Sequence, residues 1–285
     1  MADFYSRRVK RLLPAVLLVL LAVVVVAGVY GPPSEFAQRL SEVRATIFYF
    51  ANWNLISSSD DYFAESFSVS PLRHMWSLAV EEQFYFVWPL VLTGLIALFG
   101  RRDRLQIPVI AAIVVSAYLL WYHYSPATVT RAYFGTDSRV FQPLMGSALA
   151  IALALHPTST WGRWSRRTAW AAAGTVALTG LVVLTWMLDG NESAYFRWGA
   201  IAGGVLSLVV IIDGEVHPRS PVSRFLALKP LVLLGTISYG FYLWHWPVIE
   251  WIRPPGGAGF VDRRLVSLGQ FAESLAGAVA GCVLG

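Results

Sequence analysis

Residues 71–90 read Pro71-Leu-Arg-His-Met-Trp-Ser-Leu-Ala-Val-Glu-Glu-Gln-Phe-Tyr-Phe-Val-Trp-Pro-Leu90 and open an apolar segment that continues to about Phe99. A carboxylate at the centre of a bilayer costs about 2.5–3.5 kcal/mol on insertion scales, so it normally faces protein or a water-filled cavity. At about 100° per residue, the polar side chains of this segment fall on one face of a helix. They form a stripe of His74, Ser77, Glu81, Tyr85 and Trp88.

The other side chains of this segment are also sorted by face. Glu82 lies beside the polar stripe. The opposite face suits contact with lipid, and it carries Trp76, Val80, Phe86 and Val87. An acid, an imidazole and a hydroxyl therefore converge on one side of a predicted membrane helix. The alternative is a simple polar contact between helices, because His and Glu hydrogen-bond across helix interfaces in membranes.

A second apolar segment, residues 230–252, has the same character. Ser238, Tyr242 and His245 share one stripe at helical spacing, and Tyr239 is close by. A lone His with a Tyr is usually an interhelical hydrogen bond. Two His-bearing helices in one bundle instead favour a shared polar cavity, in which His can move protons near neutral pH.

The composition indicates a polytopic membrane protein. The 285 residues are 56% hydrophobic and 14% charged, whereas soluble domains carry roughly 25% charged residues. The 12 Trp and 12 Tyr suit aromatic belts at the membrane interfaces. The single cysteine, Cys282, excludes an internal disulfide and a cysteine-based metal site, and we predict no bound metal. The net charge of +5 does not indicate a nucleic-acid partner, because the Lys and Arg are concentrated in alternate segments between the apolar runs, as membrane topology requires.

The apolar runs predict an all-α transmembrane bundle of about eight spans in a single domain over residues 1–285. The first run is too long for a signal peptide and has no clear cleavage site. Residues 45–56 are too short to span and predict a short helix or a re-entrant piece. No internal repeat points to a transporter built from repeats. The predicted spans are residues 12–30, 74–99, 105–121, 140–155, 168–188, 196–212, 230–252 and 265–284.

The basic residues orient the chain. Alternate segments (residues 1–11, 101–104, 156–167 and 213–229) hold 13 of the 22 Lys and Arg, and the longer intervening segments hold nine. The positive-inside rule then places the N-terminus in the cytoplasm of a multi-pass protein of the cell inner membrane. The parts predicted to face outward are residues 31–73, Asp137, Arg139 and residues 253–264.

Two groups of charged residues flank the predicted spans. The cations of the first group, Arg7, Arg8 and Arg11, either orient the chain and contact anionic lipid or clamp a phosphorylated ligand, since Arg binds phosphate bidentately. Asp137 and Arg139 stand at the outer start of a span, two residues apart, and would pair poorly along one helix. A loop ion pair or a helix cap by Asp137 explains them; alternatively, Arg139 points into the cavity as a binding or electrophilic group.

Several blocks of the sequence resemble the signature blocks of bacterial acyltransferase family 3. Phe4-Tyr-Ser-Arg-Arg-Val-Lys-Arg-Leu-Leu-Pro14 resembles that family's Arg-rich start of its third span. The resemblance covers nearly the whole chain, in the right order. The other three matching blocks are His74-Met-Trp-Ser-Leu-Ala-Val-Glu-Glu-Gln-Phe-Tyr85, Gly135-Thr-Asp-Ser-Arg139 and Leu234-Gly-Thr-Ile-Ser-Tyr-Gly-Phe-Tyr-Leu-Trp-His-Trp-Pro-Val248, of which the first and third are long and specific.

This resemblance implies an integral membrane O-acyltransferase. Such enzymes move an acetyl or similar acyl group from cytoplasmic acyl-CoA to a hydroxyl of a cell-surface or exported glycan. The reaction needs a base, a site for the CoA phosphates and stabilisation of an oxyanion. Under this reading Arg7, Arg8 and Arg11 bind the CoA phosphates.

The remaining roles that we assign from the resemblance are catalytic or substrate-binding. Glu81 and His74 orient or accept the hydroxyl, and Ser77 holds Glu81. Arg139 and His245 bind the acceptor or polarise the acyl carbonyl. The full catalytic set is His74, Ser77, Glu81, Glu82, Arg139 and His245, and the substrate-binding set is Trp76, Asp137, Tyr239 and Tyr242.

The sequence also departs from the family pattern. The family opens with two spans that bear an Arg and, eleven residues on, a His regarded as catalytic, and neither these nor the usual C-terminal ending is found here. We therefore expect an eight-span piece of a ten-span fold, either a fragment, a gene with a wrongly assigned start or a degenerate copy; a fragment would lack the His that the family pattern uses. Members with similar blocks carry an outward hydrolase-like domain, which is an expected partner. Two alternatives from other classes are a proton-coupled or lipid-linked glycan transporter and a non-catalytic membrane scaffold.

Overall fold

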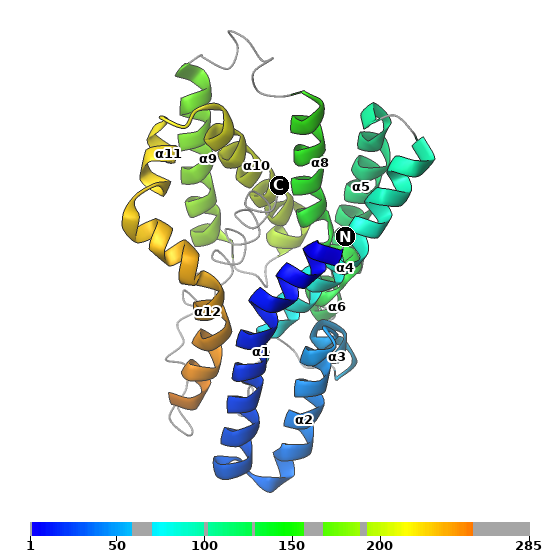
Figure 1. Ribbon diagram of the computed structural model, residues 1–285, viewed down its shortest axis with the longest axis vertical. Coiled ribbons are helices and arrows are strands. Elements are labelled where there is room, and N and C mark those ends of the chain that lie inside the picture. The colour runs from blue at the N-terminus through cyan, green and yellow to red at the C-terminus, as the bar shows by residue number, and fades with distance from the viewer. Residues whose placement is uncertain are drawn as a thin grey trace. The chain divides into compact units, whose positions relative to one another are not determined.

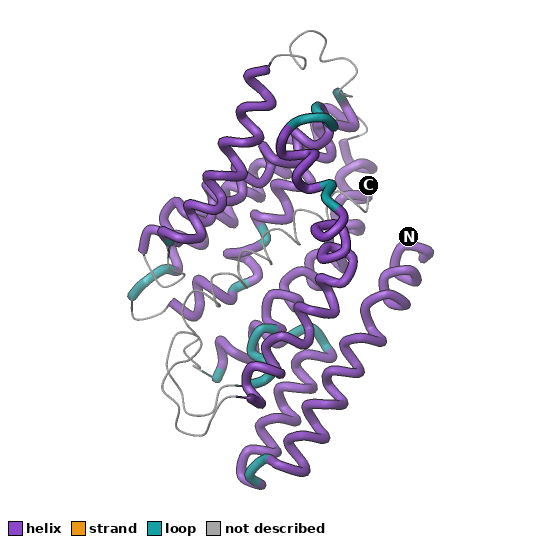
Figure 2. Tube along the Cα trace, turned by 90° about the vertical axis from the view of Figure 1, so that its left-hand side faces the viewer, coloured by secondary structure: helices purple, strands orange, loops and turns teal. Residues whose placement is uncertain are grey.

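The predicted all-α fold is confirmed in the computed structural model of the chain. Every regular element of the described residues is a helix, and none of them is a strand (Figure 2). The predicted span at residues 265–284 and the loop at residues 253–264 lie outside the described part. The structure describes residues 2–58, 70–99, 102–126, 129–156, 168–188 and 193–252.

The chain divides into two compact units. The first unit contains residues 1–90, 134–136 and 237–260, and the second contains the rest of the chain. The helices of the first unit are labelled in Figure 1. They are α1 (Ala2–Tyr30), α2 (Pro33–Ile47), α3 (Ala51–Ser57), α4 (Met75–Phe99) up to Leu90, and α12 (Lys229–Ile252) from Ile237.

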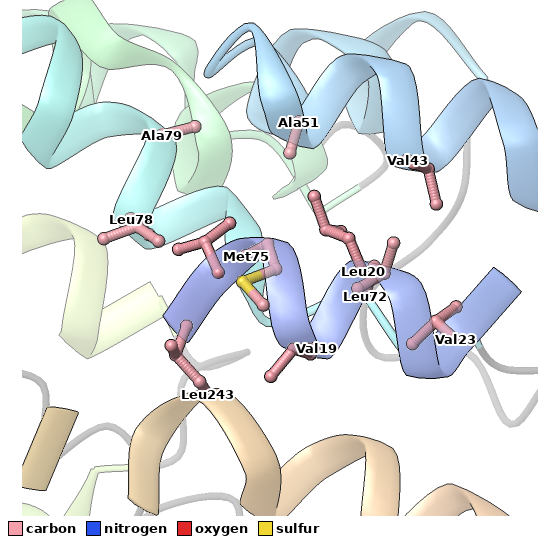
Figure 3. Close-up of a cluster of buried hydrophobic side chains, with 11 residues drawn as sticks. Val19, Leu20, Val23, Val43, Ala51, Leu72, Met75, Leu78, Ala79 and Leu243 are labelled. Carbon is pink, nitrogen blue, oxygen red and sulfur yellow. The ribbon is translucent and has the colours of Figure 1, made fainter. Parts of the chain in front are cut away.

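An apolar core joins the helices of the first unit (Figure 3). The central side chains come from α1, where Val19 is fully buried and Val23 is 1% exposed. Met75 of α4 and Leu243 of α12 pack into the same cluster, and Val43 adds α2 to it. Because α2 runs back along α1, it carries the following residues toward the middle of α1 and α4.

The second unit is built from helix pairs. Helix α9 packs on α10, and α5 packs on α8. A π-helical turn at Tyr195–Gly199 leads into α10. The elements are η1 (Arg102–Leu105), α5 (Gln106–His123), α6 (Val129–Phe134), α7 (Thr136–Arg139), α8 (Phe141–Leu155), α9 (Thr168–Met187), η4 (Tyr195–Gly199), α10 (Ala200–Val216) and α11 (Pro221–Leu226).

The helices have the character of a membrane protein. Of the described residues, four segments are long and apolar enough to cross a bilayer: Asp3–Tyr30, Met75–Phe99, Gln106–His123 and Tyr195–Val216. Two shorter apolar helices, α8 and the Ala172–Met187 part of α9, match two further predicted spans. Helix α12 has the predicted position and 24 residues, but its polar side chains leave it outside this apolar set.

One local prediction differs from the structure. The short helix expected over residues 45–56 is broken at residues 48–50, between the end of α2 and the start of α3. Helix α2 itself begins at Pro33, twelve residues before the start of the short helix that the sequence predicted. A proline at the first turn suits a helix start, because its missing N–H has no partner there in any case.

Candidate active site

The polar stripes predicted on α4 and α12 meet in the first unit. The ring centroid of His74 lies 5.3 Å from that of His245 and 5.2 Å from that of Tyr242. The Ser77 hydroxyl lies 2.7 Å from the Tyr242 hydroxyl, which also bonds to the His74 carbonyl. If Tyr242 donates to that carbonyl, Ser77 donates to Tyr242. We call His74, Ser77, Tyr242 and His245 the imidazole cluster.

The two imidazoles have different surroundings. His74 is 4% exposed, and neither of its ring nitrogens has hydrogen-bond geometry with a described residue, although the backbone of Pro71 and Leu243 lies beside the ring. His245 is half-buried, and its Nδ1 lies 2.6 Å from the Tyr242 carbonyl. In a neutral ring this Nδ1 carries the proton that is donated to the carbonyl, which leaves Nε2 with a free lone pair. His245 is therefore equipped to accept a proton.

A second group of polar residues joins α1 to α4. Arg8 donates to both carboxylate oxygens of Glu82, at 3.1 and 2.6 Å, and its guanidinium lies 3.5 Å from the centroid of the Tyr85 ring. The two paired side chains are only 14% and 10% exposed. Glu81 adjoins the pair and feels both charges. We call Arg8, Glu81, Glu82 and Tyr85 the carboxylate cluster.

This cluster has an uneven charge. One guanidinium balances one carboxylate, and Arg8 is already engaged by Glu82 in a bidentate pair, the strongest geometry for such a contact. The adjacent Glu81 then needs a proton, a donor or a ligand to stabilise it in a poorly solvated position. An ionised Glu81 carboxylate can accept a hydrogen bond from a hydroxyl group of a substrate.

Two tyrosines from other elements approach the carboxylate cluster. Tyr239 of α12 donates to the Leu12 carbonyl at 3.2 Å, and its phenol interacts electrostatically with Arg8 and Glu82. Tyr49, between α2 and α3, feels the same two charges. Tyr239 was predicted to bind substrate, whereas Tyr49 was not predicted, because no pattern in residues 31–73 links it to α1 or α4.

The predicted cation group is divided by the structure. Arg7, Lys10 and Arg11 are exposed on one side of α1, whereas Arg8 is turned toward α4. Residues 7 and 11 are one helical turn apart and share a face, but residue 8 is rotated by about 100° from residue 7. Arg8 therefore serves the carboxylate cluster, and Arg7 and Arg11 stay available to a ligand in solution or to lipid.

The lipid-facing assignment on α4 is correct only in its second half. Phe86 and Val87 are 65% and 51% exposed, as expected. Trp76 and Val80 were placed on the wrong surface, since they are 4% and 6% exposed. Trp76 packs edge-on against Phe134, with 5.1 Å between centroids, because residues 134–136 cover this part of the helix in the first unit.

Arg139 and Asp137 belong to the second unit. Arg139 is 5% exposed, donates to the Tyr133 carbonyl at 2.8 Å and bonds to the Tyr195 hydroxyl. Asp137 forms the expected loop ion pair, but with Arg131, at 2.9 and 2.7 Å. Burial alone would raise the pKa of Asp137; the hydrogen bonds and charge of Arg131 hold that pKa below its usual value.

The two clusters together contain the chemical groups that an acyl transfer requires. They supply a proton-accepting imidazole, hydroxyls that can relay a proton, and carboxylates beside a guanidinium. No group of three or more His, Cys, Asp or Glu in the described part of the chain is placed to hold a metal ion. The residues named in the two clusters are acid, base and hydroxyl groups of the first unit.

Comparison with known proteins gives a consistent picture. The sequence model of a protein family described as an acyltransferase domain matches residues 1–285. The O-acetyltransferase OatA of Staphylococcus aureus is 34% identical over 253 residues, which are 88% of this chain and 41% of that protein. The peptidoglycan O-acetyltransferase OatA of Listeria monocytogenes is 34% identical over 254 residues, 88% of this chain and 40% of that protein.

The matches cover only part of each relative. The chain spans about two fifths of the length of both relatives. No solved structure is significantly similar to the chain.

Proposed function

The chain belongs to the family of these acyltransferase domains, bacterial acyltransferase family 3, and from that premise we propose that it is a membrane O-acyltransferase. It moves an acyl group from cytoplasmic acyl-CoA to a hydroxyl of a cell-envelope glycan. The names of both relatives favour acetyl as the acyl group, and that of the Listeria protein favours peptidoglycan as the acceptor. The observation that carries the proposal is the meeting of His74 and His245 beside Ser77 and Tyr242.

The transfer requires a proton acceptor for the attacking hydroxyl. We assign this role to Nε2 of His245, because Nδ1 is oriented by the Tyr242 carbonyl. The acceptor oxygen attacks the thioester carbonyl carbon, a C–O bond forms and the C–S bond breaks. The proton passes from the hydroxyl through the imidazole to the departing CoA thiolate, so the step balances without a metal or redox partner.

The carboxylate cluster has a binding role in this scheme. Glu81 accepts a hydrogen bond from a second hydroxyl of the glycan, and Arg8 holds Glu82 and thereby fixes the neighbouring backbone of α4. A carboxylate that binds one hydroxyl of the glycan orients the neighbouring hydroxyl for attack, and orientation alone can supply several kcal/mol of the rate enhancement.

The donor site lies on the exposed side of α1. Arg7 and Arg11, with Lys10 between them, are free of the carboxylate cluster and carry the chemistry that phosphate groups bind. We place this end of α1 in the cytoplasm of an inner-membrane protein, where acyl-CoA and the anionic headgroups are found. The surrounding lipid and the glycan are then the partners of the chain.

Transfer of label from acetyl-CoA tests this function. Membrane vesicles that contain the chain are incubated with radiolabelled acetyl-CoA and a peptidoglycan fragment, and acceptor-bound label is counted. Replacement of the proton acceptor by His245→Gln should lower the rate at least about 100-fold. His156→Gln, outside both clusters, is the matched control and should leave the rate unchanged.

The same preparation distinguishes the alternatives. Glycan uptake that follows a proton gradient and ignores acetyl-CoA would replace our proposal with a transporter. Equal label transfer by wild type and His245→Gln would remove the base that we assign.

A further inference from the structure

Tyr49 occupies an unusual backbone position at the end of α2. The Phe50 N–H donates to the Ala45 carbonyl at 2.7 Å, and the Tyr49 N–H donates to the Thr46 carbonyl at 3.1 Å. These two bonds define a Schellman motif, in which the residue after the helix cap adopts the left-handed conformation. That residue here is Tyr49, with a φ of 56°.

Glycine is the residue that this position normally selects. A side chain with a Cβ is disfavoured at positive φ, and a bulky aromatic one is a clear outlier. Tyr49 is the only non-glycine residue with positive φ in the described ranges. Backbone strain of this kind persists where the surrounding structure enforces it and is concentrated at functional sites. The strained position therefore calls for a reason that lies in the tyrosine side chain.

A closed ring of hydrogen bonds holds the turn in place. Gln83 of α4 donates to the Tyr49 carbonyl at 2.6 Å and to the Asn52 side-chain oxygen at 3.0 Å. Asn52, fully buried, donates to the Thr136 hydroxyl at 2.9 Å, and Thr136 donates back to Gln83 at 2.6 Å. The Tyr49 backbone is thus anchored to the residue that follows Glu82 on α4.

The Tyr49 side chain lies within electrostatic range of the carboxylate cluster. Its phenol feels the charges of Glu82 and Arg8, and its ring packs against the apolar core of the first unit. Burial raises the pKa of Tyr49, and the Glu82 carboxylate raises it further, while Arg8 opposes them. The hydroxyl therefore keeps its proton at neutral pH and is a hydrogen-bond donor.

This donor has no acceptor among the residues that the structure describes, although it is near enough to Arg8 and Glu82 to interact with their charges. A Phe at this position would pack equally well against the core, and a Gly would adopt the positive φ without strain. Only the hydroxyl distinguishes Tyr from Phe at this position, so the hydroxyl is the group whose use explains the strained residue.

We propose that the Tyr49 hydroxyl contacts the substrate, donating a hydrogen bond to an oxygen of the group bound at the Arg8–Glu82 pair. The inference rests on the proposed acyl transfer. Two oxygens have the required chemistry, the acyl carbonyl of the donor and the hydroxyl of the acceptor. Both oxygens accept hydrogen bonds, so the Tyr49 hydroxyl could donate to either one.

Kinetics of Tyr49→Phe test this contact. The substitution keeps the ring, its packing and the positive φ but removes the donor. We expect a fall in kcat/KM of about tenfold, the usual size for loss of one substrate hydrogen bond, with an unchanged unfolding midpoint. Tyr30→Phe is the control, because Tyr30 is 83% exposed at the end of α1. A change in KM for acetyl-CoA assigns the contact to the donor, and a change in KM for the peptidoglycan fragment assigns it to the acceptor.

A second readout does not depend on turnover. N-acetylimidazole acetylates accessible phenols, and mass spectrometry measures the modification of the Tyr49 peptide. Acetyl-CoA or the peptidoglycan fragment should protect Tyr49 at least about twofold and leave Tyr30 unchanged. Protection without any label transfer would refute the proposed function and keep the contact. Full activity of Tyr49→Phe together with no protection by either ligand would refute the contact while the acyl transfer stands.

Discussion

The Arg8–Glu82 pair makes the most demanding prediction about stability. Both side chains are at most 14% exposed, and the contact is bidentate. Loss of one partner of a buried pair costs about 3–5 kcal/mol, because the other charge remains buried without compensation. In Glu82→Gln the guanidinium still lies over the Tyr85 ring, which retains about 1–2 kcal/mol. We therefore expect a destabilisation of about 2–3 kcal/mol for Glu82→Gln.

The opposite deletion should be worse. Arg8→Met leaves Glu81 and Glu82 adjacent, without a counter-charge, and we expect a loss near the upper end of the range, about 5 kcal/mol. In the double variant, Arg8→Met with Glu82→Gln, neither member of the pair leaves an uncompensated charge, and its stability should return to within about 1–2 kcal/mol of wild type. The coupling energy of the cycle should then exceed about 2 kcal/mol.

Unfolding in mixed micelles, followed by tryptophan fluorescence, measures these free energies. Arg7→Met is the matched control, because Arg7 is exposed one position earlier on the same helix; it should change the stability by less than about 0.5 kcal/mol. A loss for Glu82→Gln as small as that of the control, or single losses that simply add in the double variant, would show that the pair is not buried as described.

Two further predictions concern the second unit. Arg131 lowers the pKa of Asp137, so the ion pair stabilises the fold above about pH 4, and this stabilisation is lost as the pH falls through the lowered pKa. Both groups are partly exposed, so Arg131→Gln should reduce the free energy of unfolding by only about 0.5–1 kcal/mol at neutral pH. The difference between the variant and wild type should be smaller in unfolding at about pH 3. A Cβ added at Gly174 would lie 2.5 Å from the Asp213 carboxyl carbon, so Gly174→Ala should lower stability by about 1–3 kcal/mol in thermal unfolding. Gly146→Ala, which meets nothing within 4 Å, should not lower it.

Local patterns in the sequence were sufficient for the helices and for half of the site. The polar stripe of α4 and that of α12 predicted a shared cavity, and the 5.3 Å separation of the His74 and His245 rings confirms that they meet. Periodicity is enough for such a prediction, because ionisable side chains in apolar helices must face one another or water. The same reasoning placed Phe86 and Val87 correctly at the exposed surface.

Helical periodicity gave wrong predictions where a neighbouring segment covers a helix face that the periodicity assigns to lipid. Trp76 reads as lipid-facing on a helical projection, but residues 134–136 cover it in the first unit. Asp137 reads as a partner or cap for its own short helix, but Arg131, six residues earlier, forms the ion pair. In both cases the deciding neighbour comes from another element, which a projection of one helix does not include.

The sequence by itself determined that this chain is an all-helical membrane protein with imidazoles on the polar stripes of two helices and carboxylates on one of them, because hydrophobic periodicity is a property of each helix alone. Only the tertiary structure decided that Arg8, and not Arg7 or Arg11, binds Glu82, and that Tyr49 stands beside them. Three similar cations on one helix differ only in direction, and direction acquires a chemical meaning only when another helix packs against that side. A tyrosine in a left-handed turn has no signature in the sequence, because its position is held by Gln83, Asn52 and Thr136 from three separate segments.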